Sequence, residues 1–321
     1  MIFVKKGDAC IMITTVTLNA AVDKTYQVPE FREGSLHRIP EMSMLAGGKG
    51  NNVARVTATL GEPVIATGFL AGHTGKLIEK LLEEDGIRHE YMFVPGESRT
   101  CITIVDPRNS RQTELLESGP VIQEEHLNKM KQKIRQLAVR SSFVIFSGSL
   151  PSGCSPSAYV DLIRTAKEEG ARVILDTSGE ALEQSLAGLP DLIKPNEHEV
   201  AKLAGRSISS EVDILTSITS LNQRGIRHVV VSLGGNGALA GIDGSLYRVH
   251  LPKINMVNAV GSGDSMVAGM AIALMKEYSP EEVLKLGCAC GSANALHMQA
   301  GRVQADEVYE LQANIKVERL N

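Results

Sequence analysis

The chain has 321 residues, of which 43% are hydrophobic and 22% are charged. These values are typical of a globular protein with a substantial core, arranged as one large α/β domain or two smaller ones. The net charge of −4 and the absence of tryptophan argue against a nucleic-acid partner, because such proteins usually carry a basic excess and stacking aromatic residues. No run approaches the roughly 20 apolar residues of a membrane span, so no membrane partner is expected.

The N-terminus and the cysteines indicate a cytoplasmic protein. Residues 1–11 are short and contain Lys5, Lys6 and Asp8, which makes a poor signal peptide. The first clean strand signal begins after Met12, so we expect residues 1–11 to be an N-terminal extension. The five cysteines include no CxxC pair, which favours reduced thiols.

Strand and helix signals alternate along most of the chain. Short apolar runs rich in Val and Ile predict strands at residues 13–18, 143–147, 172–176, 192–194 and 228–233. Amphipathic stretches predict helices at residues 123–139, 157–169 and 211–224. Buried strands that alternate with helices predict an α/β fold with a mostly parallel central sheet covered on both faces.

Two segments, at about residues 24–45 and 89–117, break this alternation. Thr100, Ile102 and Ile104 alternate with other residues before a turn at 107–110, which predicts a β-ribbon. Both segments are too long for ordinary connecting loops. We therefore expect a small sheet that projects from the main domain, as a lid over a substrate, a dimer contact surface, or both.

A glycine-rich turn at residues 260–266 is the most informative motif. Gly261, Ser262 and Gly263 precede Asp264 where helical spacing begins, and residues 251–257 before them are expected to be extended. Unpaired N–H groups at a helix start favour an anion, and Asp264 could accept a proton from a hydroxyl that attacks a phosphoryl group held there. The alternative is a glycine C-cap followed by an Asp N-cap.

A second set of motifs lies near the N-terminus. Gly47, Gly48, Lys49 and Asn52 stand at another predicted helix start, where they could bind sugar hydroxyls or a phosphate. The GxxxxGK[ST] spacing is missing, so this is no Walker A loop. Asp23 follows a strand end, where ligands of α/β sheets collect, and could accept hydrogen bonds from two sugar hydroxyls. The alternatives are a glycine turn with a solvated lysine and an Asx turn.

Two further motifs follow later strands. Asn196 and Glu199, after Lys194, would share one face of a helix start and suit a hydrated Mg²⁺, although a capping box explains them equally. Glycines from Gly234 to Gly237 follow the strand that ends near Ser232; they would let a nucleotide approach the backbone, or form a tight turn. The GxGxxG dinucleotide pattern is missing, which disfavours a dehydrogenase.

Taken together and in order, the motifs resemble those of the ribokinase-type (PfkB) carbohydrate kinases, in the branch of 1-phosphofructokinases and tagatose-6-phosphate kinases. The markers are Thr17-Leu18-Asn19 with Asp23, Gly47-Gly48-Lys49-Gly50 with Asn52, Ser147-Gly148-Ser149-Leu150-Pro151, Asp176 with Ser178-Gly179, Lys194-Pro195-Asn196 with Glu199, Ser232-Leu233-Gly234, and Gly261 with Gly263-Asp264-Ser265. The branch usually has Pro where Ala20 stands and Ala where Ser262 stands. The resemblance implies one ribokinase-like three-layer α/β/α kinase domain over residues 12–321.

The resemblance also implies roles for single residues. Asp264 would be the general base, with an anion hole formed by Gly261, Ser262 and Gly263. The groups that would bind the sugar and its phosphate are Asp23, Gly47, Gly48, Lys49, Asn52, Arg99 and Arg38. Those that would line the ATP site are Lys194, Asn196, Glu199, Ser232, Gly234, Gly237 and Asn294, with Asn196 and Glu199 acting on Mg²⁺ through water and phosphate. Some relatives bind a monovalent cation such as K⁺, and the corresponding segment here is 258–260.

The leading functional prediction is therefore an ATP-dependent kinase that converts a ketohexose monophosphate to a bisphosphate. Fructose 1-phosphate is the favoured substrate, and tagatose 6-phosphate is the alternative. A non-catalytic sugar-phosphate sensor on a kinase fold is the alternative from another class, since fold does not imply function. We expect a homodimer that forms through the small projecting sheet.

Overall fold

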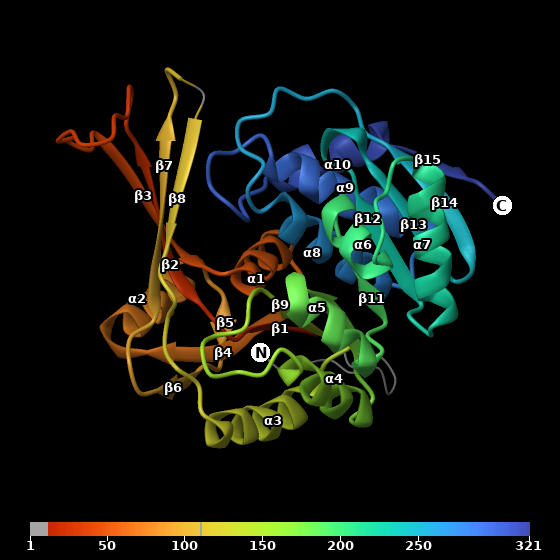
Figure 1. The fold of residues 1–321 in the computed structure, drawn as a ribbon, viewed down its shortest axis with the longest axis horizontal. Helices are drawn as coiled ribbons and strands as arrows, with labels where there is room; N and C mark the ends of the chain where they lie inside the picture. The colour runs from red at the N-terminus through yellow and green to blue at the C-terminus, as the bar shows by residue number, and fades with distance from the viewer. Residues whose placement is uncertain (1–11, 110) are drawn as a thin grey trace.

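The computed structural model describes residues 12–109 and 111–321, and is built on two sheets of different size (Figure 1). The larger sheet has eleven strands in the order β15-β14-β13-β12-β11-β10-β9-β1-β4-β5, with β6 paired to β4. Its strands are β1 (Ile13–Thr17), β4 (Val64–Ala71), β5 (Arg88–His89), β6 (Met92–Val94), β9 (Phe143–Ser147), β10 (Arg172–Asp176), β11 (Leu192–Ile193), β12 (His228–Ser232), β13 (Ala238–Ile242), β14 (Ser245–His250) and β15 (Lys316–Arg319).

The large sheet is parallel from β5 to β12 and antiparallel from β12 to β15. Helices cover both of its faces. One face carries α1 (Lys49–Thr59), α2 (Gly72–Glu84), α8 (Ser262–Met275), α9 (Pro280–Asn294) and α10 (Ala305–Asn314). The other carries α3 (Glu124–Ala138), α4 (Ala158–Glu168), α5 (Gly179–Ser185), α6 (Glu197–Ala204) and α7 (Glu211–Gln223).

Strand β9 shows why the sequence folds in this way. Phe143 and Ile145 belong to the apolar cluster on one face of the sheet, and Val144 and Phe146 to the cluster on the other. All four side chains are buried, because successive residues of a strand point to opposite faces and both faces are covered. The predicted α/β class and mostly parallel sheet are confirmed, and the predicted bounds of β9 and β10 are those observed.

The smaller sheet, here called the lid sheet, contains β2 (Ala21–Gln27), β3 (Glu41–Gly47), β7 (Arg99–Asp106) and β8 (Arg111–Leu116) in the order β3-β2-β7-β8. It projects from the main body next to α1 and α2 (Figure 1). The two segments predicted as insertions supply most of it. Ile102 pairs with Leu115 and Ile104 with Thr113, as the alternation around the 107–110 turn predicts.

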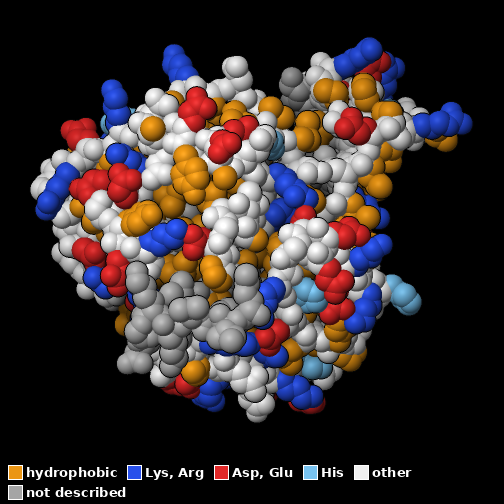
Figure 2. Space-filling view, turned by 180° about the vertical axis from the view of Figure 1, so that it is seen from behind, with side chains coloured by type: hydrophobic (Ala, Val, Ile, Leu, Met, Phe, Trp, Pro, Cys, Tyr) orange, Lys and Arg blue, Asp and Glu red, His pale blue; other side chains and the backbone are white. Residues whose placement is uncertain are grey.

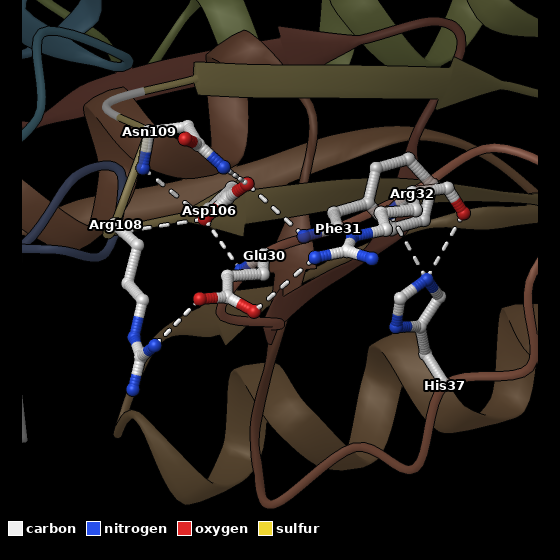
Figure 3. A network of polar contacts seen from close by, with 7 residues as sticks. All are labelled: Glu30, Phe31, Arg32, His37, Asp106, Arg108 and Asn109. Atoms are coloured by element: carbon white, nitrogen blue, oxygen red, sulfur yellow. Dashed lines mark hydrogen bonds and ion pairs between the residues drawn. The ribbon is translucent and has the colours of Figure 1, made fainter.

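The tip of the lid sheet is held by the carboxylate of Asp106 (Figure 3). It accepts hydrogen bonds from the N–H groups of Glu30 at 2.9 Å and Phe31 at 3.0 Å, and from the side chain of Asn109 at 2.7 Å. Arg108 forms an ion pair with Glu30 at 2.6 Å. These contacts fasten the loop 28–40 to the β7–β8 turn, so the far end of the lid is an organised structure.

Basic and acidic side chains are interspersed on the face of the molecule seen from behind (Figure 2). Within the described residues, no helix is both long enough and apolar enough to cross a membrane. The predicted N-terminal extension, residues 1–11, lies outside the described residues.

Most of the sequence motifs lie near the junction between the two sheets.

Candidate active site

Asp264 lies in the first turn of α8, next to the base of the lid sheet. Gly261 caps this helix with a φ of 84°, in the left-handed region that favours glycine. A Cβ atom there would lie 2.8 Å from the Cβ of Ala300, so a larger residue would force the two segments apart. Residues 251–261 form neither strand nor helix, so the extended segment predicted at 251–257 is wrong and the helix follows a loop.

The start of α8 presents open backbone N–H groups. Ser262 donates its N–H to the carbonyl of Ala259 at 3.2 Å. Among the residues that the structure describes, we find no acceptor for the N–H groups of Gly261, Gly263 or Asp264. Free N–H groups and the positive end of the helix dipole favour an anion here, as the sequence predicts for Gly261 and Gly263.

The Asp264 carboxyl is unusually basic for an aspartate. Its side chain is only 6% exposed, and burial raises its pKa to about 6. The Asp176 carboxylate pushes the pKa in the same direction, whereas the ammonium groups of Lys49 and Lys194 and a hydrogen bond from Asn52 pull it down. A carboxyl with this pKa is ionised at neutral pH and is a better proton acceptor than an ordinary aspartate.

Two lysines flank Asp176 beneath the Asp264 site. Nζ of Lys49 lies 3.3 Å and Nζ of Lys194 3.5 Å from the Asp176 carboxylate, which is 3% exposed. Burial opposes ionisation of Asp176, but the two ammonium groups outweigh it and hold its pKa below the usual value. Asp176 in turn raises the pKa of Lys49. The two cations are thus fixed beside the open helix start, where a phosphoryl group would need neutralisation.

The predicted sugar contacts Asp23, Gly47 and Gly48 meet at the base of the lid. A Cβ atom on Gly47 would lie 2.1 Å from Cγ of Asp23, so only glycine leaves room for this carboxylate. Burial raises the pKa of Asp23, while nearby Arg99 lowers it. Arg99 donates through Nε to the carbonyl of Asn19 at 3.1 Å.

A cleft separates the inner face of the lid sheet from the main body. The lid side is lined by Asp23, Thr25 and Ser43, and the body side by Asn258 and Ala300, among others. The cleft connects the carboxylate predicted to bind sugar with the loop that leads into α8. A small polyhydroxylated substrate could therefore contact the lid sheet and this loop at once.

Arg38 is not brought to this group within one chain. It is exposed and lies in the loop 28–40 at the far end of the lid. Strand β2 alone spans about 20 Å from its base at Ala21 to Gln27, at roughly 3.3 Å per residue. The predicted phosphate contact of Arg38 therefore has no geometric support from a single chain.

Asn196 and Glu199 form a capping box at the start of α6. The Asn196 side chain accepts the N–H of Glu199 and the Glu199 carboxylate accepts the N–H of Asn196, both at 2.9 Å. The capping alternative is therefore confirmed. Glu199 also raises the pKa of Lys49, which places its carboxylate near that ammonium group.

The side chains that could act as metal ligands test the prediction that Mg²⁺ binds here. The described residues include no group of three or more His, Cys, Asp or Glu side chains that could hold a metal ion. Glu199 and Asn196 fit an ion that takes most of its ligands from phosphate oxygens and water, as Mg²⁺ commonly does. Either side chain could also orient a ligand water while it caps the helix.

The predicted nucleotide glycines lie beside this helix start. A β-bridge joins Ser232 to Asn196, so the end of β12 and the start of α6 form one edge. Gly237 has a φ of 92°, and a Cβ atom there would lie 2.0 Å from the carbonyl oxygen of Val249. Gly234 faces open space. Ser232 and Gly234 thus border an accessible strip of backbone, while Gly237 is required by the turn.

The structure does not support the prediction that Asn294 lines the ATP site. This residue is completely buried at the end of α9, and both ends of its amide are occupied. Its Nδ2 donates to the carbonyl of Val260 at 2.8 Å, and its Oδ1 accepts the N–H of Gly301 at 2.7 Å. With no free polar atom, Asn294 holds the turn before α8 in place and does not face a nucleotide.

Sequence reasoning missed two residues at the centre of this site. Asp176 belongs to a motif of the family resemblance but was given no role, and Arg55 was not singled out at all. Each is a charged residue next to an apolar run, Val-Ile-Leu before Asp176 and Val53-Ala54 before Arg55. A charge that belongs to a buried segment needs a partner, and that was the available signal.

Comparison with known proteins agrees with this geometry. The model of the pfkB family carbohydrate kinases matches residues 9–306. The chain belongs to this family. A curated tagatose-6-phosphate kinase from Staphylococcus epidermidis is 38% identical over 309 residues, which cover 95% of this chain and 99% of that protein. The family match confirms the predicted carbohydrate kinase.

Solved structures give the same result. Phosphofructokinase-2 from Escherichia coli, in complex with potassium, superposes with a TM-score of 0.89 at 29% identity, covering 95% of this chain and 99% of that one. A possible 1-phosphofructokinase from Thermotoga maritima also gives 0.89, at 26% identity, covering 97% and 100%. The PfkB kinase fold therefore extends over nearly the whole chain.

Proposed function

We propose that this kinase transfers the γ-phosphoryl group of ATP to the free primary hydroxyl of a ketohexose monophosphate, giving a bisphosphate. The observation that carries the proposal is the buried Asp264 carboxyl, with its pKa near 6, beside the open N–H groups that begin α8. A base and an anion site within one helical turn are what phosphoryl transfer to a hydroxyl requires.

In the proposed reaction, Asp264 accepts the hydroxyl proton as the sugar oxygen forms a bond to the γ-phosphorus and the bond from that phosphorus to the ADP oxygen breaks. The N–H groups of Gly263 and Asp264 hold the transferred group, and Lys49 and Lys194 offset its charge. The nucleotide lies along Ser232 and Gly234. Mg²⁺, held through Glu199, Asn196 and phosphate oxygens, would supply further charge neutralisation.

The sugar lies in the cleft under the lid sheet, with its hydroxyls on Asp23 and Gly48. Arg99, at the base of β7, is the cation best placed for the phosphate already on the sugar, because its charge lowers the pKa of Asp23, which lines the cleft. Lys49 is paired with Asp176 close to Asp264, which favours the transferred phosphate as its ligand. An unphosphorylated sugar would have no use for Arg99.

We favour fructose 1-phosphate as substrate, phosphorylated at the 6-hydroxyl. Tagatose 6-phosphate, phosphorylated at the 1-hydroxyl, is the second candidate, and the 38% identity to a tagatose-6-phosphate kinase supports it. The test is a coupled ADP-release assay with Mg-ATP on both sugars, fructose 6-phosphate and free fructose. A higher kcat/KM for one phosphorylated ketose names the substrate, and turnover of free fructose alone would contradict the proposal.

The same assay in KCl and in NaCl tests a monovalent cation requirement. The segment 258–260 is fixed to the end of α9, since Asn258 donates to the carbonyl of Met298 at 2.7 Å and Val257 to that of Ala295 at 2.7 Å. We propose K⁺ as the ion, because the potassium complex of a structural neighbour shares this fold. Equal rates in both salts would show that the enzyme does not require K⁺.

We also propose a homodimer formed through the outer face of the lid sheet. Thr25 and Ser43 face the main body, so the alternate residues of each strand face away from it. These outward residues are largely apolar and include Tyr26, Ile102 and the half-exposed Met42 and Leu115. A two-sided sheet with an apolar outer face is stabilised when a second copy covers it.

Substitution of Met42 and Leu115 together by Lys tests this interface. We expect the double variant to sediment as a monomer, because two charges would be buried against the partner. The matched control is Val212→Lys, which alters an apolar residue 70% exposed on α7, away from the lid. A double variant that keeps the mass of the unmodified protein would exclude this face.

A further inference from the structure

The hydrogen bond that Asp264 receives comes from Asn52, whose side chain is in turn held by the buried guanidinium of Arg55. Arg55 lies on α1, three residues after Asn52 and therefore on the same side of the helix. Its side chain is 2% exposed, so its guanidinium is an internal charge. A charge in this position needs partners on most of its N–H groups, and their identity shows what the residue does.

The partners of Arg55 form a chain that ends at Asp264. Its Nε donates to the Asp85 carboxylate at 2.7 Å and one terminal nitrogen to the carbonyl of Ala46 at 2.6 Å. The other terminal nitrogen donates to Oδ1 of Asn52 at 3.0 Å. Nδ2 of Asn52 then donates to Oδ2 of Asp264 at 2.8 Å.

The chemistry of these groups fixes their direction. A guanidinium only donates hydrogen bonds, so the end of the Asn52 amide that faces Arg55 must be the oxygen. The NH₂ end is then left to face Asp264. Without the guanidinium the amide could rotate and present its oxygen to the Asp264 carboxylate, an arrangement that repels the ionised form.

The surroundings leave Asn52 little other freedom. The segment after α9 covers it, since a Cβ atom on Gly301 would lie 2.9 Å from Cα of Asn52. Arg302 meets Asp85 at 2.7 Å, so Asp85 holds one arginine on each side. Oδ1 of Asp264 has no hydrogen-bond partner in the described part of the chain, which leaves it free for a substrate hydroxyl.

We propose that Arg55 is a positioning residue for phosphoryl transfer, which locks the Asn52 amide so that its N–H group points at Asp264 and keeps Oδ1 of that carboxylate directed to the substrate. This inference rests on the proposed role of Asp264 as the base. Because the Asn52 hydrogen bond lowers the pKa of Asp264, loss of the lock should raise it.

The test is the pH dependence of kcat at saturating substrates for Arg55→Lys and Arg55→Gln. A lysine can reach Asp85 or Asn52 but cannot hold both in one plane. We expect the acidic limb of the curve of kcat against pH to move to higher pH by about 0.5–1 unit in these variants. Their activity should be partly regained above pH 8. A purely structural role would lower activity equally at every pH, and an unmoved limb in a folded variant overturns the proposal.

Arg302→Met is the matched control, because it removes the other arginine on Asp85 without touching Asn52. We expect it to lower the melting temperature and to leave the limb in place; a limb that moves as far as in Arg55→Lys would overturn the specific role of Arg55. Asn52→Ala carries the test if neither Arg55 variant folds. It should move the limb upward by itself, and an unmoved limb there also overturns the proposal.

The double variant Asn52→Ala with Arg55→Lys shows whether Arg55 acts through Asn52. The two effects on the limb should not add, since one hydrogen bond is lost in either case, and full additivity contradicts the inference. Asp264→Asn separates this result from the proposed function. If that variant keeps near-normal turnover, the base is wrong; if it is inactive while Arg55→Lys leaves the limb unmoved, only the positioning role fails.

Discussion

The amide of Asn52 and the carboxylate of Asp264 join the starts of two helices that are 212 residues apart in the sequence, at 2.8 Å. Helix α1 begins in the motif that we propose for the sugar, and α8 in the motif that we propose for the transferred phosphate. Their contact places the proposed base between the two proposed sites. It also links the pKa of Asp264 to the side chains that hold Asn52.

The raised pKa of Asp264 predicts a cost in stability at neutral pH. The carboxyl binds protons more tightly in the folded chain, with a pKa of about 6, than in the unfolded chain, at 3.8. Its ionisation therefore lowers the free energy of unfolding as the pH rises through this window. We expect Asp264→Asn to be more stable than the unmodified protein at pH 8, by on the order of 3 kcal/mol.

Urea denaturation at several pH values measures this difference. It should shrink as the pH falls from 7 to about 3, where Asp264 is largely protonated in both the folded and the unfolded chain. A difference that is absent at pH 8, or that grows toward low pH, would mean that the carboxyl is not held in a destabilising environment.

Asp176→Asn should move the activity profile in the direction opposite to the Arg55 variants. Asp176 raises the pKa of Asp264, so its neutralisation should shift the acidic limb to lower pH. The same change leaves Lys49 and Lys194 without their shared anion and should destabilise the fold by about 3–5 kcal/mol. The pH profile of kcat and a denaturation curve check both; an upward shift of the limb would contradict this electrostatic arrangement.

Arg99→Ala should weaken binding of the sugar phosphate with little change in kcat. A charge-assisted hydrogen bond to phosphate is worth roughly 1.5–3 kcal/mol, which corresponds to a rise in KM of about 10- to 100-fold. Steady-state kinetics with the sugar varied at saturating ATP measures it. Arg111→Ala, at an exposed position on the neighbouring strand β8, is the matched control. An unchanged KM in the Arg99 variant would remove Arg99 from the site.

Much of the fold follows from local pattern. The strands 143–147 and 172–176 are short, mostly apolar runs rich in Val and Ile between turn residues, which is typical of strands buried on both faces. The segment 251–257 forms no strand, and its apolar residues Met256 and Val257 are more than half exposed, so they mark no buried face of a sheet. Pairing partners are decided by tertiary contacts that periodicity does not contain.

Sequence alone could predict the parts of the site in which the backbone requires a glycine next to a candidate functional carboxylate. Gly47 and Gly261 are fixed by close approaches. The motif of Gly261 contains Asp264, and Asp23, which Gly47 contacts, was predicted from its place after a strand end. Arg55, Asp176 and Asn294 act through side chains that are distant in sequence from their partners. Arg38 shows the reverse case, since a basic residue in a suggestive segment proved to lie at the exposed tip of the lid.

Steady-state turnover of Asp264→Asn on the preferred ketose phosphate shows whether Asp264 is the base. We expect kcat to fall by roughly 10²–10⁴, the usual contribution of a positioned base, while the variant stays folded and binds ATP. Asp161→Asn, a change to an exposed carboxylate on α4 that pairs with Lys131, should keep its turnover. Near-normal kcat in folded Asp264→Asn would contradict the account.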